Sequence, residues 1–515
     1  MLKSKISKLV VSSIVIFSIL SSLISFYPLL KSGPRAVIFN FEPEVAYVAN
    51  ALSYIGFKEI SYTGHPATPS ILAIAYSFTP LRLYAKYIDH MPFFLWTIKN
   101  EIFLFYYTRV FVSAIFALAT GIFLYSIYKF TESFKSLLFS WIGLFLYSNT
   151  PYLGIIPQSE PLSFLILSLW LLVFCNFLSK KTLKIYLILS GLAALSVANK
   201  LPNMFFVMAS LIQIFSFPKL KLVKRIKYFL YGVGVTCTLF VIGTWPIKNQ
   251  YLSLWQWIVQ LATHTGIHGR GDNNIFSLAT HFNSLNTLFL LEKGPTILIL
   301  ITLVFWFIYI KNKKSNITLP INLFFGSLLL GIAVFGKFSL SHYHQFHYIG
   351  ILFIASYLVS KFYKGIYWMA IALLIIFSFK NISNYWKINI IETNYSISLE
   401  EFVHNNPPKI ATVWEWGRSL DYSLIHIRDW IGIRYSIYLN PERPNLLSLS
   451  TDMTKIVVSQ DNEKEVFSAC WDQLYIQGSE LPRFINKYPK NKIVTQSIPG
   501  SKDMWLITSN HCLEK

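Results

Sequence analysis

Long uncharged stretches recur along the first three-quarters of the chain. The first, LVVSSIVIFSILSSLISFYPLL from Leu9 to Leu30, has the length that a helix needs to cross a bilayer. Tyr27 and Pro28 stand where a cleaved signal peptide would have small residues, so this stretch is predicted to remain as a membrane anchor. Comparable runs continue as far as Phe379, and they predict about eleven membrane-spanning helices.

Lysines occupy every second gap between the predicted spans. They precede span one and follow spans two, four, six, eight and ten, at Lys3, Lys5 and Lys8; Lys129 and Lys135; Lys180, Lys181 and Lys184; Lys219 to Lys227; Lys311 to Lys314; and Lys361 and Lys364. Short, lysine-rich loops are typical of the cytoplasmic side of a membrane protein. The N-terminus is therefore predicted inside, and the loop after span one and the chain beyond Phe379 are predicted outside.

Composition agrees with this topology. Of the 515 residues, 54% are hydrophobic and only 13% are charged, whereas soluble domains carry about 25% charged residues. The net charge of +21 raises the question of nucleic-acid binding, but the lysines are concentrated in the predicted cytoplasmic loops. Membrane lipids are therefore the predicted surroundings, and no nucleic-acid partner is expected.

Three outer segments interrupt this apolar pattern: residues 31–100, residues 247–295 and the tail from residue 381 onward. In the first outer loop, residues 31–100, EVAYVANALSYI and PSILAIAYSFTPLRLYAKYI have helical periodicity and predict amphipathic helices lying along the membrane surface. In the tail, KIATVW, KIVVSQ and MWLITS are short strand-like runs. The predicted fold is mainly α: a polytopic helical membrane domain over residues 1–380 and a small soluble outer α/β domain over residues 381–515.

The four cysteines divide between these two parts. Cys175 and Cys237 lie in apolar spans, where they serve as small hydrophobic residues. Cys470 and Cys512 both lie in the predicted outer domain, which faces an oxidising compartment. A disulfide between Cys470 and Cys512 is therefore predicted.

Several cations break the pattern that keeps positive charge inside. Arg109 lies near the outer end of the second span, Lys200 and Lys337 lie in outer gaps, and Arg270 lies in the outer sequence GRGD. A cation at the apolar layer is costly and is a functional hypothesis by default. Together these four suit the binding of a phosphate through charge-assisted hydrogen bonds. The plainer alternative is that each side chain reaches the outer headgroups by itself.

Two glutamates, Glu42 and Glu44, flank Pro43 at the start of the first outer loop. Proline and acidic residues are favoured at a helix N-terminus, which is a sufficient structural reason for them. The functional alternative is that one glutamate is a general base aimed at an acceptor hydroxyl, with its pKa raised by partial desolvation. The sequence leaves both interpretations open.

A late outer segment contains His342, His344 and His347 in the spacing H-x-H-x-x-H. His344 and His347 would share one face of a helix, as metal ligands can. No outer carboxylate or cysteine belongs to this motif, however, and histidines also hydrogen-bond to sugars and headgroups. No metal-ligand set is predicted, and a requirement for a divalent metal is left open.

These motifs, in their order, resemble those of the GT-C superfamily of integral-membrane glycosyltransferases, in particular the branch with protein O-mannosyltransferases and lipid A aminoarabinose transferases. The matching segments are EVAY from Glu44 to Tyr47, GHPATPSILAIAY with His65, the span that contains Arg109, SEPLSFLILSLWLL with Glu160, GLAALSVANK ending on Lys200, and Lys337 followed by HYHQFHYIG. The family motif Asp-Glu-Ala-x-Tyr is altered here at Glu44 and Val45, and the late proline of the family is replaced by Gly350 or lost. The resemblance covers residues 1–380.

The resemblance implies an inverting transfer of a sugar from a polyprenyl-phosphate donor to a hydroxyl of a lipid, glycan or protein acceptor. It also implies an outward-facing active site, which we expect in a bacterial inner membrane. Glu44 or Glu42 would be the base. The donor phosphate would bind to Lys200, Lys337, Arg109 and Arg270, and the acceptor and sugar side would be formed by His65, Tyr47, Glu160, His342 and His344.

Two other functions compete with this one. A lipid-linked polysaccharide polymerase or ligase would use an Arg/His-rich late loop, for which HTGIHGRGDNN is a candidate, but it has no need of the acidic first loop. A transporter would be expected to place charges at the middle of its spans and to show repeat symmetry, and neither is evident in the sequence.

Overall fold

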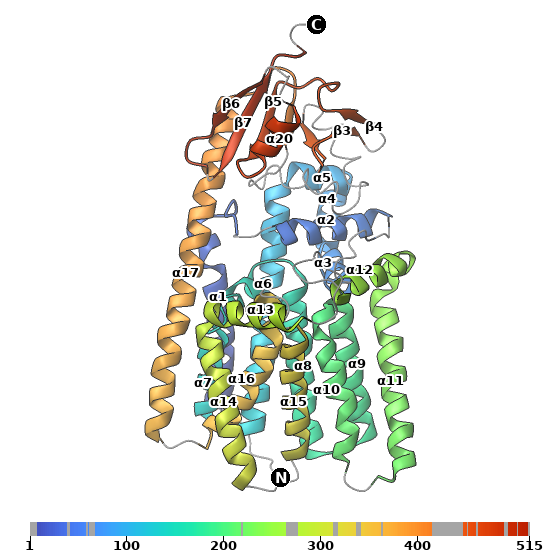
Figure 1. Ribbon diagram of the computed structural model, residues 1–515, viewed down its shortest axis with the longest axis vertical. Helices are drawn as coiled ribbons and strands as arrows, with labels where there is room; N and C mark the ends of the chain where they lie inside the picture. Colours follow the sequence, from blue (N-terminus) through green and yellow to red (C-terminus); the bar gives the residue numbers. More distant parts are fainter. Residues whose placement is uncertain are drawn as a thin grey trace. The chain divides into compact units, whose positions relative to one another are not determined.

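The computed structural model is mainly helical, with a β-sheet near the C-terminus (Figure 1). It describes residues 8–38, 42–57, 60, 67–217, 220–263, 277–312, 318–335, 341–361, 364–414, 446–450, 452–459, 462–488, 493–501 and 503–512. The chain forms two compact units. The helical unit consists of Met1–Phe26, Thr63–Ser70 and Val112–Tyr385, and the sheet unit consists of Tyr27–Tyr62, Ile71–Phe111 and Trp386–Lys515.

Most of the apolar helices belong wholly to the helical unit. They are α7 (Phe134–Leu144), α8 (Ser159–Ser179), α9 (Leu183–Asn199), α10 (Met204–Leu211), α11 (Leu222–Thr244), α12 (Tyr251–Thr263), α13 (Leu278–Leu291), α14 (Lys293–Asn312), α15 (Thr318–Phe335) and α16 (Gln345–Val359). Short 3-10 helices connect or extend them at η1 (Thr150–Gly154), η2 (Leu201–Asn203), η3 (Ile212–Ser216), η4 (Trp245–Gln250) and η6 (Ser341–Tyr343). Four helices contribute residues to both units: α1 (Lys8–Ser32), α3 (Thr68–Ser77), α6 (Glu101–Thr131) and α17 (Lys364–Asn405).

Several helices are suited to crossing a membrane. Among the described residues, five are long and apolar enough, or six if α13 and α14, which meet at a bend of 107°, count as one span. Shorter apolar helices occupy other stretches from which spans are predicted. The apolar, mainly helical character is thus confirmed, while the number of about eleven spans and their orientation stay predictions.

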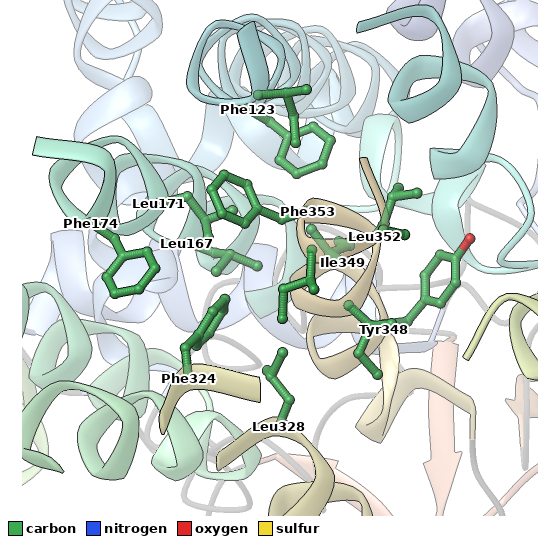
Figure 2. Close-up of a cluster of buried hydrophobic side chains, with 14 of the residues drawn as sticks. Phe123, Leu167, Leu171, Phe174, Phe324, Leu328, Tyr348, Ile349, Leu352 and Phe353 are labelled. Carbon is green, nitrogen blue, oxygen red and sulfur yellow. The ribbon is translucent and has the colours of Figure 1, made fainter. Parts of the chain in front are cut away.

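The core of the helical unit is built around α16. Every residue of α16 is buried, because its sequence is apolar on all sides and it packs against α7, α14 and α15. Figure 2 shows side chains from α6, α8, α15 and α16 that meet there, among them Phe123, Phe174, Phe324 and Phe353. Gly143 of α7 permits this close packing, since a Cβ at that position would lie 2.6 Å from Leu352 Cδ1.

The sheet unit contains a mixed sheet with the described strand order β4-β3-β2-β1-β5-β7-β6. The strands are β1 (Thr412–Trp414), β2 (Leu446–Leu449), β3 (Lys455–Ser459), β4 (Asn462–Glu465), β5 (Gln473–Gln477), β6 (Ile493–Ser497) and β7 (Met504–Ser509). The central β1 is parallel to β2 and β5, and all the other pairs are antiparallel. The unit also contains α2 (Glu42–Phe57), α4 (Thr79–Tyr87), α5 (Phe93–Lys99) and α20 (Leu481–Lys487).

Alternate residues of the central strands enter separate hydrophobic clusters. Val413 of β1 shares a cluster with Phe484 of α20, while the next residue, Trp414, shares a cluster with Leu399 of α17. This alternation is what the two-residue period of a strand requires. Helices therefore cover both faces of the sheet, and the predicted strand runs KIATVW, KIVVSQ and MWLITS become β1, β3 and β7.

Helix α17 extends beyond the predicted end of the membrane domain. It runs for 42 residues, so residue 381, the predicted start of the outer domain, lies within it. The first outer loop forms helices over most of its described length, as its periodicity predicts. The division into domains at residues 380 and 381 stays a prediction.

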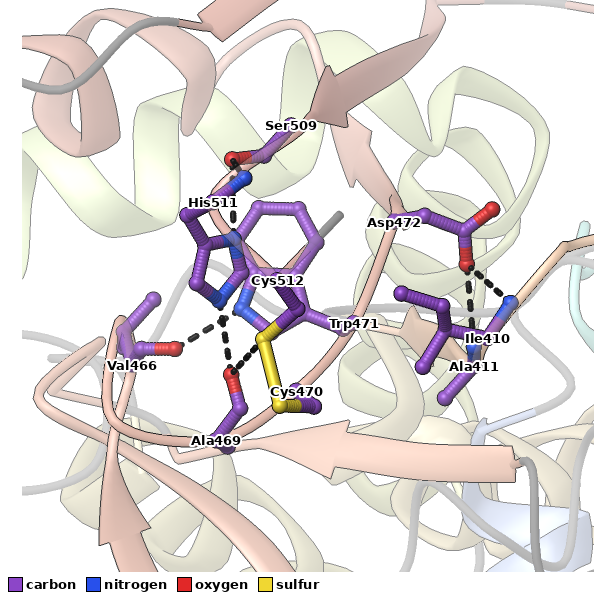
Figure 3. The surroundings of a disulfide bond; sticks show 10 residues. All are labelled: Ile410, Ala411, Val466, Ala469, Cys470, Trp471, Asp472, Ser509, His511 and Cys512. Atoms are coloured by element: carbon purple, nitrogen blue, oxygen red, sulfur yellow. Dashed lines mark hydrogen bonds between the residues drawn. A yellow bond between two sulfur atoms is a disulfide. The ribbon is translucent and has the colours of Figure 1, made fainter. Parts of the chain in front are cut away.

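A disulfide joins Cys470, just before β5, to Cys512, after β7 (Figure 3). Side chains next to the disulfide form hydrogen bonds to the backbone. Trp471 Nε1 donates to the Val466 carbonyl at 2.7 Å, and the Asp472 carboxylate accepts from the Ile410 and Ala411 amides at 3.0 and 2.9 Å.

Replacing both Cys470 and Cys512 by serine should destabilise the sheet unit. The disulfide closes a sequence separation of 42 residues, for which chain-entropy models give about 4 kcal/mol. Thermal unfolding of the purified protein should therefore begin at a lower temperature, and a reducing agent should produce the same shift in the wild type. Serine at the exposed free Cys237 is the matched control. If the wild type, the double serine variant and Cys237→Ser all begin to unfold at the same temperature, the disulfide does not stabilise the sheet unit.

Candidate active site

Glu44 and Arg109 form a buried ion pair in the sheet unit. Arg109 Nε donates to Glu44 Oε1 at 2.6 Å, and an η nitrogen of Arg109 donates to Oε2 at 2.8 Å. The other η nitrogen donates to the Ala36 carbonyl at 2.6 Å. Both side chains are 0% exposed. The two parallel bonds fix the plane of the carboxylate, which is the geometry that arginine provides and lysine does not.

The position of Glu44 on α2 explains part of this arrangement. Glu42 begins the helix and Glu44 follows within its first turn, where a negative charge is favoured. Burial raises the pKa of the Glu44 carboxyl above its ordinary value, although the charge of Arg109 opposes this. Tyr47 follows one helical turn later and is also buried. The side chain of Glu42 lies outside the described residues.

A second buried ion pair, between Glu160 and Lys200, lies in the helical unit. Glu160 is in the first turn of α8, Lys200 follows the last residue of α9, and Lys200 Nζ contacts Glu160 Oε1. The side chain of Lys200 is 0% exposed. Its Nζ also lies 3.4 Å from the His342 carbonyl oxygen and 5.8 Å from the Tyr343 ring centroid. The late His/Tyr segment thus contributes to the surroundings of Lys200.

Asn199, the residue before Lys200, fixes the end of α9. Its Oδ1 accepts from the Ser70 amide at 3.0 Å and from the Ser70 hydroxyl at 2.7 Å. Its Nδ2 donates to the Ser159 carbonyl at 2.6 Å and to the Ser163 hydroxyl at 2.8 Å. The side chain therefore ties the starts of α3 and α8 to the end of α9, and it holds Lys200 beside Glu160.

Replacing Asn199 by leucine should both destabilise the protein and slow any reaction that depends on Lys200. The change removes four hydrogen bonds and leaves buried partners unpaired, at a cost of about 3 kcal/mol or more in unfolding free energy. The midpoint of thermal unfolding measures the first effect. The control is Asn176→Leu, which removes only the exposed contact to Lys129. If Asn199→Leu and Asn176→Leu have the same midpoint of thermal unfolding, Asn199 does not stabilise the end of α9.

The late segment packs tightly at the start of α16. His344 and His347 are 4% and 1% exposed, and their ring centroids lie 6.0 Å apart. His347 stacks on Phe205 at 3.8 Å between centroids, which is typical of a core histidine. Burial raises the pKa of Tyr343 to about 12, so its hydroxyl keeps its proton. No group of three His, Cys, Asp or Glu residues within the described ranges is arranged to hold a metal.

The structure pairs residues for which the sequence predicts different tasks. Arg109, which is predicted to bind the donor phosphate, pairs with Glu44, the predicted base. Lys200, also predicted to bind the phosphate, pairs with Glu160, which is predicted to lie on the acceptor side. Both pairings were missed because nothing in the sequence connects an acid to a cation 65 or 40 residues away. His65, Arg270 and Lys337 lie outside the described residues.

Known structures share this fold over nearly the whole chain. The crystal structure of ArnT from Cupriavidus metallidurans bound to undecaprenyl phosphate matches with a TM-score of 0.57 over 96% of this chain and 98% of that chain, at 8% sequence identity. The chain has the fold of ArnT. ArnT from the same organism in the apo state matches with a TM-score of 0.56 over 96% and 97% of the two chains, at 9% identity.

The ArnT match confirms, for the fold, the resemblance that the ordered motifs indicated. No protein-family model and no curated protein matches this chain in sequence. The likeness to ArnT also extends beyond residues 1–380, the range to which the motifs had limited the resemblance, because nearly the whole chain is covered.

Proposed function

We propose that the chain transfers a sugar from a polyprenyl-phosphate-linked donor to an acceptor hydroxyl at the outer face of a bacterial inner membrane. The observation that carries this proposal is the match, over nearly the full length of both chains, to ArnT bound to undecaprenyl phosphate. An enzyme that uses a membrane-anchored donor needs apolar helices of the kind found here.

In the proposed reaction, the acceptor oxygen attacks the anomeric carbon while the bond from that carbon to the phosphate oxygen breaks. The acceptor proton passes to a carboxylate, and the bonding electrons leave with the polyprenyl phosphate, so the configuration inverts. Glu44 is the proposed base. Its raised pKa and its fixed orientation against Arg109 support this role. Glu42 is the alternative base.

Negative charge grows on the phosphate as the bond breaks, and fixed cations stabilise it. Lys200 is the proposed cation from the helical unit, together with Lys337 and Arg270. Arg109 was expected to share this task, but its bonds to both oxygens of Glu44 favour a positioning role for it. On the acceptor and sugar side, the proposal retains His65, Tyr47, His342 and His344. Glu160 is proposed to hold Lys200 in place.

Product analysis tests this proposal against its rivals. Membranes containing the protein are supplied with undecaprenyl-phosphate sugars labelled in the sugar, and the labelled products are separated by size. Transfer of one sugar to each acceptor supports the proposal. Products that grow by whole repeating units would indicate a polymerase or ligase, and label that crosses the membrane still attached to its lipid would indicate a transporter.

A further inference from the structure

Gln345, the first residue of α16, carries a buried amide group without a hydrogen bond. Its side chain is 0% exposed, and neither its amide nitrogen nor its amide oxygen has a partner among the described residues. Burying an unpaired amide destabilises a fold, because the group loses its bonds to water and gains none in exchange. Native proteins contain few such groups, so this one calls for an explanation.

The other fully buried amide side chains described in the helical unit each make at least one hydrogen bond. Asn199 makes the four bonds given above, and Asn203 Nδ2 donates to the Ser163 hydroxyl and the Ser196 carbonyl, both at 3.2 Å. Gln213 Nε2 donates to the Pro320 carbonyl at 3.1 Å, while its oxygen has no partner in the described structure. Gln345 differs from all of these because both ends of its amide are unbonded.

The position of Gln345 suggests what it binds. Three residues earlier, the His342 carbonyl contacts Lys200 Nζ, and the intervening Tyr343 places its ring near the same ammonium group. Gln345 also lies at the N-terminus of a 15-residue helix, where the helix dipole favours an anion. Gln345 therefore follows, within three residues, the two residues of this segment that contact the cation proposed for the donor phosphate.

We infer that Gln345 determines donor specificity, its amide binding the sugar-phosphate head of the lipid-linked donor. The inference rests on the proposed function. The amide NH₂ donates to a phosphate oxygen, and the amide carbonyl accepts from a sugar hydroxyl. A sugar phosphate offers both partners side by side, whereas polyprenyl phosphate without a sugar has no sugar hydroxyl. Gln345 thus favours the loaded donor over the spent carrier that the reaction releases.

The test uses the full-length protein with Gln345→Met, which keeps the volume of the side chain and removes the amide. The KM for the undecaprenyl-phosphate sugar that the wild type transfers should rise about tenfold or more. The inhibition constant of undecaprenyl phosphate should rise by a smaller factor. The midpoint of thermal unfolding measured without donor should equal or exceed that of the wild type, because an unpaired buried amide has been removed.

Gln213→Met is the matched control, since it removes a bonded buried amide from the same unit. It should lower the midpoint of thermal unfolding and leave the KM unchanged. The inference is overturned if Gln345→Met lowers this midpoint and leaves the KM unchanged, because the amide is then structural. If the wild type neither transfers any sugar nor binds undecaprenyl phosphate, the proposed function is wrong, and this inference fails with it.

Discussion

Replacing Glu44 by glutamine should abolish sugar transfer and destabilise the protein. Loss of a general base lowers rates by about a hundredfold to ten-thousandfold. The change also leaves Arg109 charged and uncompensated in a fully buried position, which costs about 3–5 kcal/mol of unfolding free energy. Transfer from labelled undecaprenyl-phosphate sugars measures the first effect, and thermal unfolding measures the second.

A double variant, Glu44→Gln with Arg109→Met, separates these two effects. Removing both charges leaves no lone buried ion, so stability should largely return while transfer stays absent. Arg35 and Glu400 supply the matched control, because they form an ion pair at 2.9 Å in the same unit with Arg35 53% exposed. Glu400→Gln should change the unfolding free energy by less than about 1 kcal/mol and leave transfer intact.

Three results would contradict this account of Glu44. If the double variant recovers both stability and transfer, the Glu44–Arg109 pair is structural and Glu44 is not the base. If Glu44→Gln transfers normally while Glu42→Gln does not, the base is Glu42. Normal transfer by both single variants would leave the two glutamates as residues that only start a helix.

The second large effect is expected at Lys200. Replacing Lys200 by methionine keeps the apolar stem and removes the ammonium group, so transfer should fall about a hundredfold or more. Replacing Glu160 by glutamine should cost stability but retain much of the transfer, because the cation remains. Measuring kcat and thermal unfolding for both variants should therefore show this asymmetry.

Lys129→Met is the control for this pair. Lys129 bonds to Asn176 Oδ1 at an exposed position, in a gap predicted to be cytoplasmic, and its loss should leave transfer unchanged. The two variants Lys200→Met and Glu160→Gln could instead lose transfer equally, each in proportion to its loss of stability. That result would show that the pair only holds α8 and α9 together.

Most of the fold follows from hydrophobic patterning. The apolar runs became helices, the periodic stretches of the first outer loop became α2 to α4, and three strand-like runs became strands. The length of α17 was missed, although the sequence carries a signal for it. No glycine or proline occurs between Gly365 and Pro407, so nothing ends the helix when its sequence turns polar.

The site was harder to predict because charge partners depend on tertiary structure. Rules about single residues predict that Arg109 and Lys200 lie on the outer side, but their pairing with Glu44 and Glu160 depends on three-dimensional contacts. Asn199 and Gln345 were missed as well. Both are polar residues next to apolar helix sequence, in ANK and HQF, and a polar residue in such a place is a signal worth examining.

The central claim is that the chain consumes a polyprenyl-phosphate-linked sugar. The most direct test places the purified wild type in lipid nanodiscs with undecaprenyl-phosphate sugars and with lipid, glycan and protein acceptors in turn, and follows undecaprenyl phosphate by mass spectrometry. We expect its release over time, matched by sugar appearing on an acceptor hydroxyl. A folded protein that releases no undecaprenyl phosphate from any donor, with any acceptor, would contradict the account.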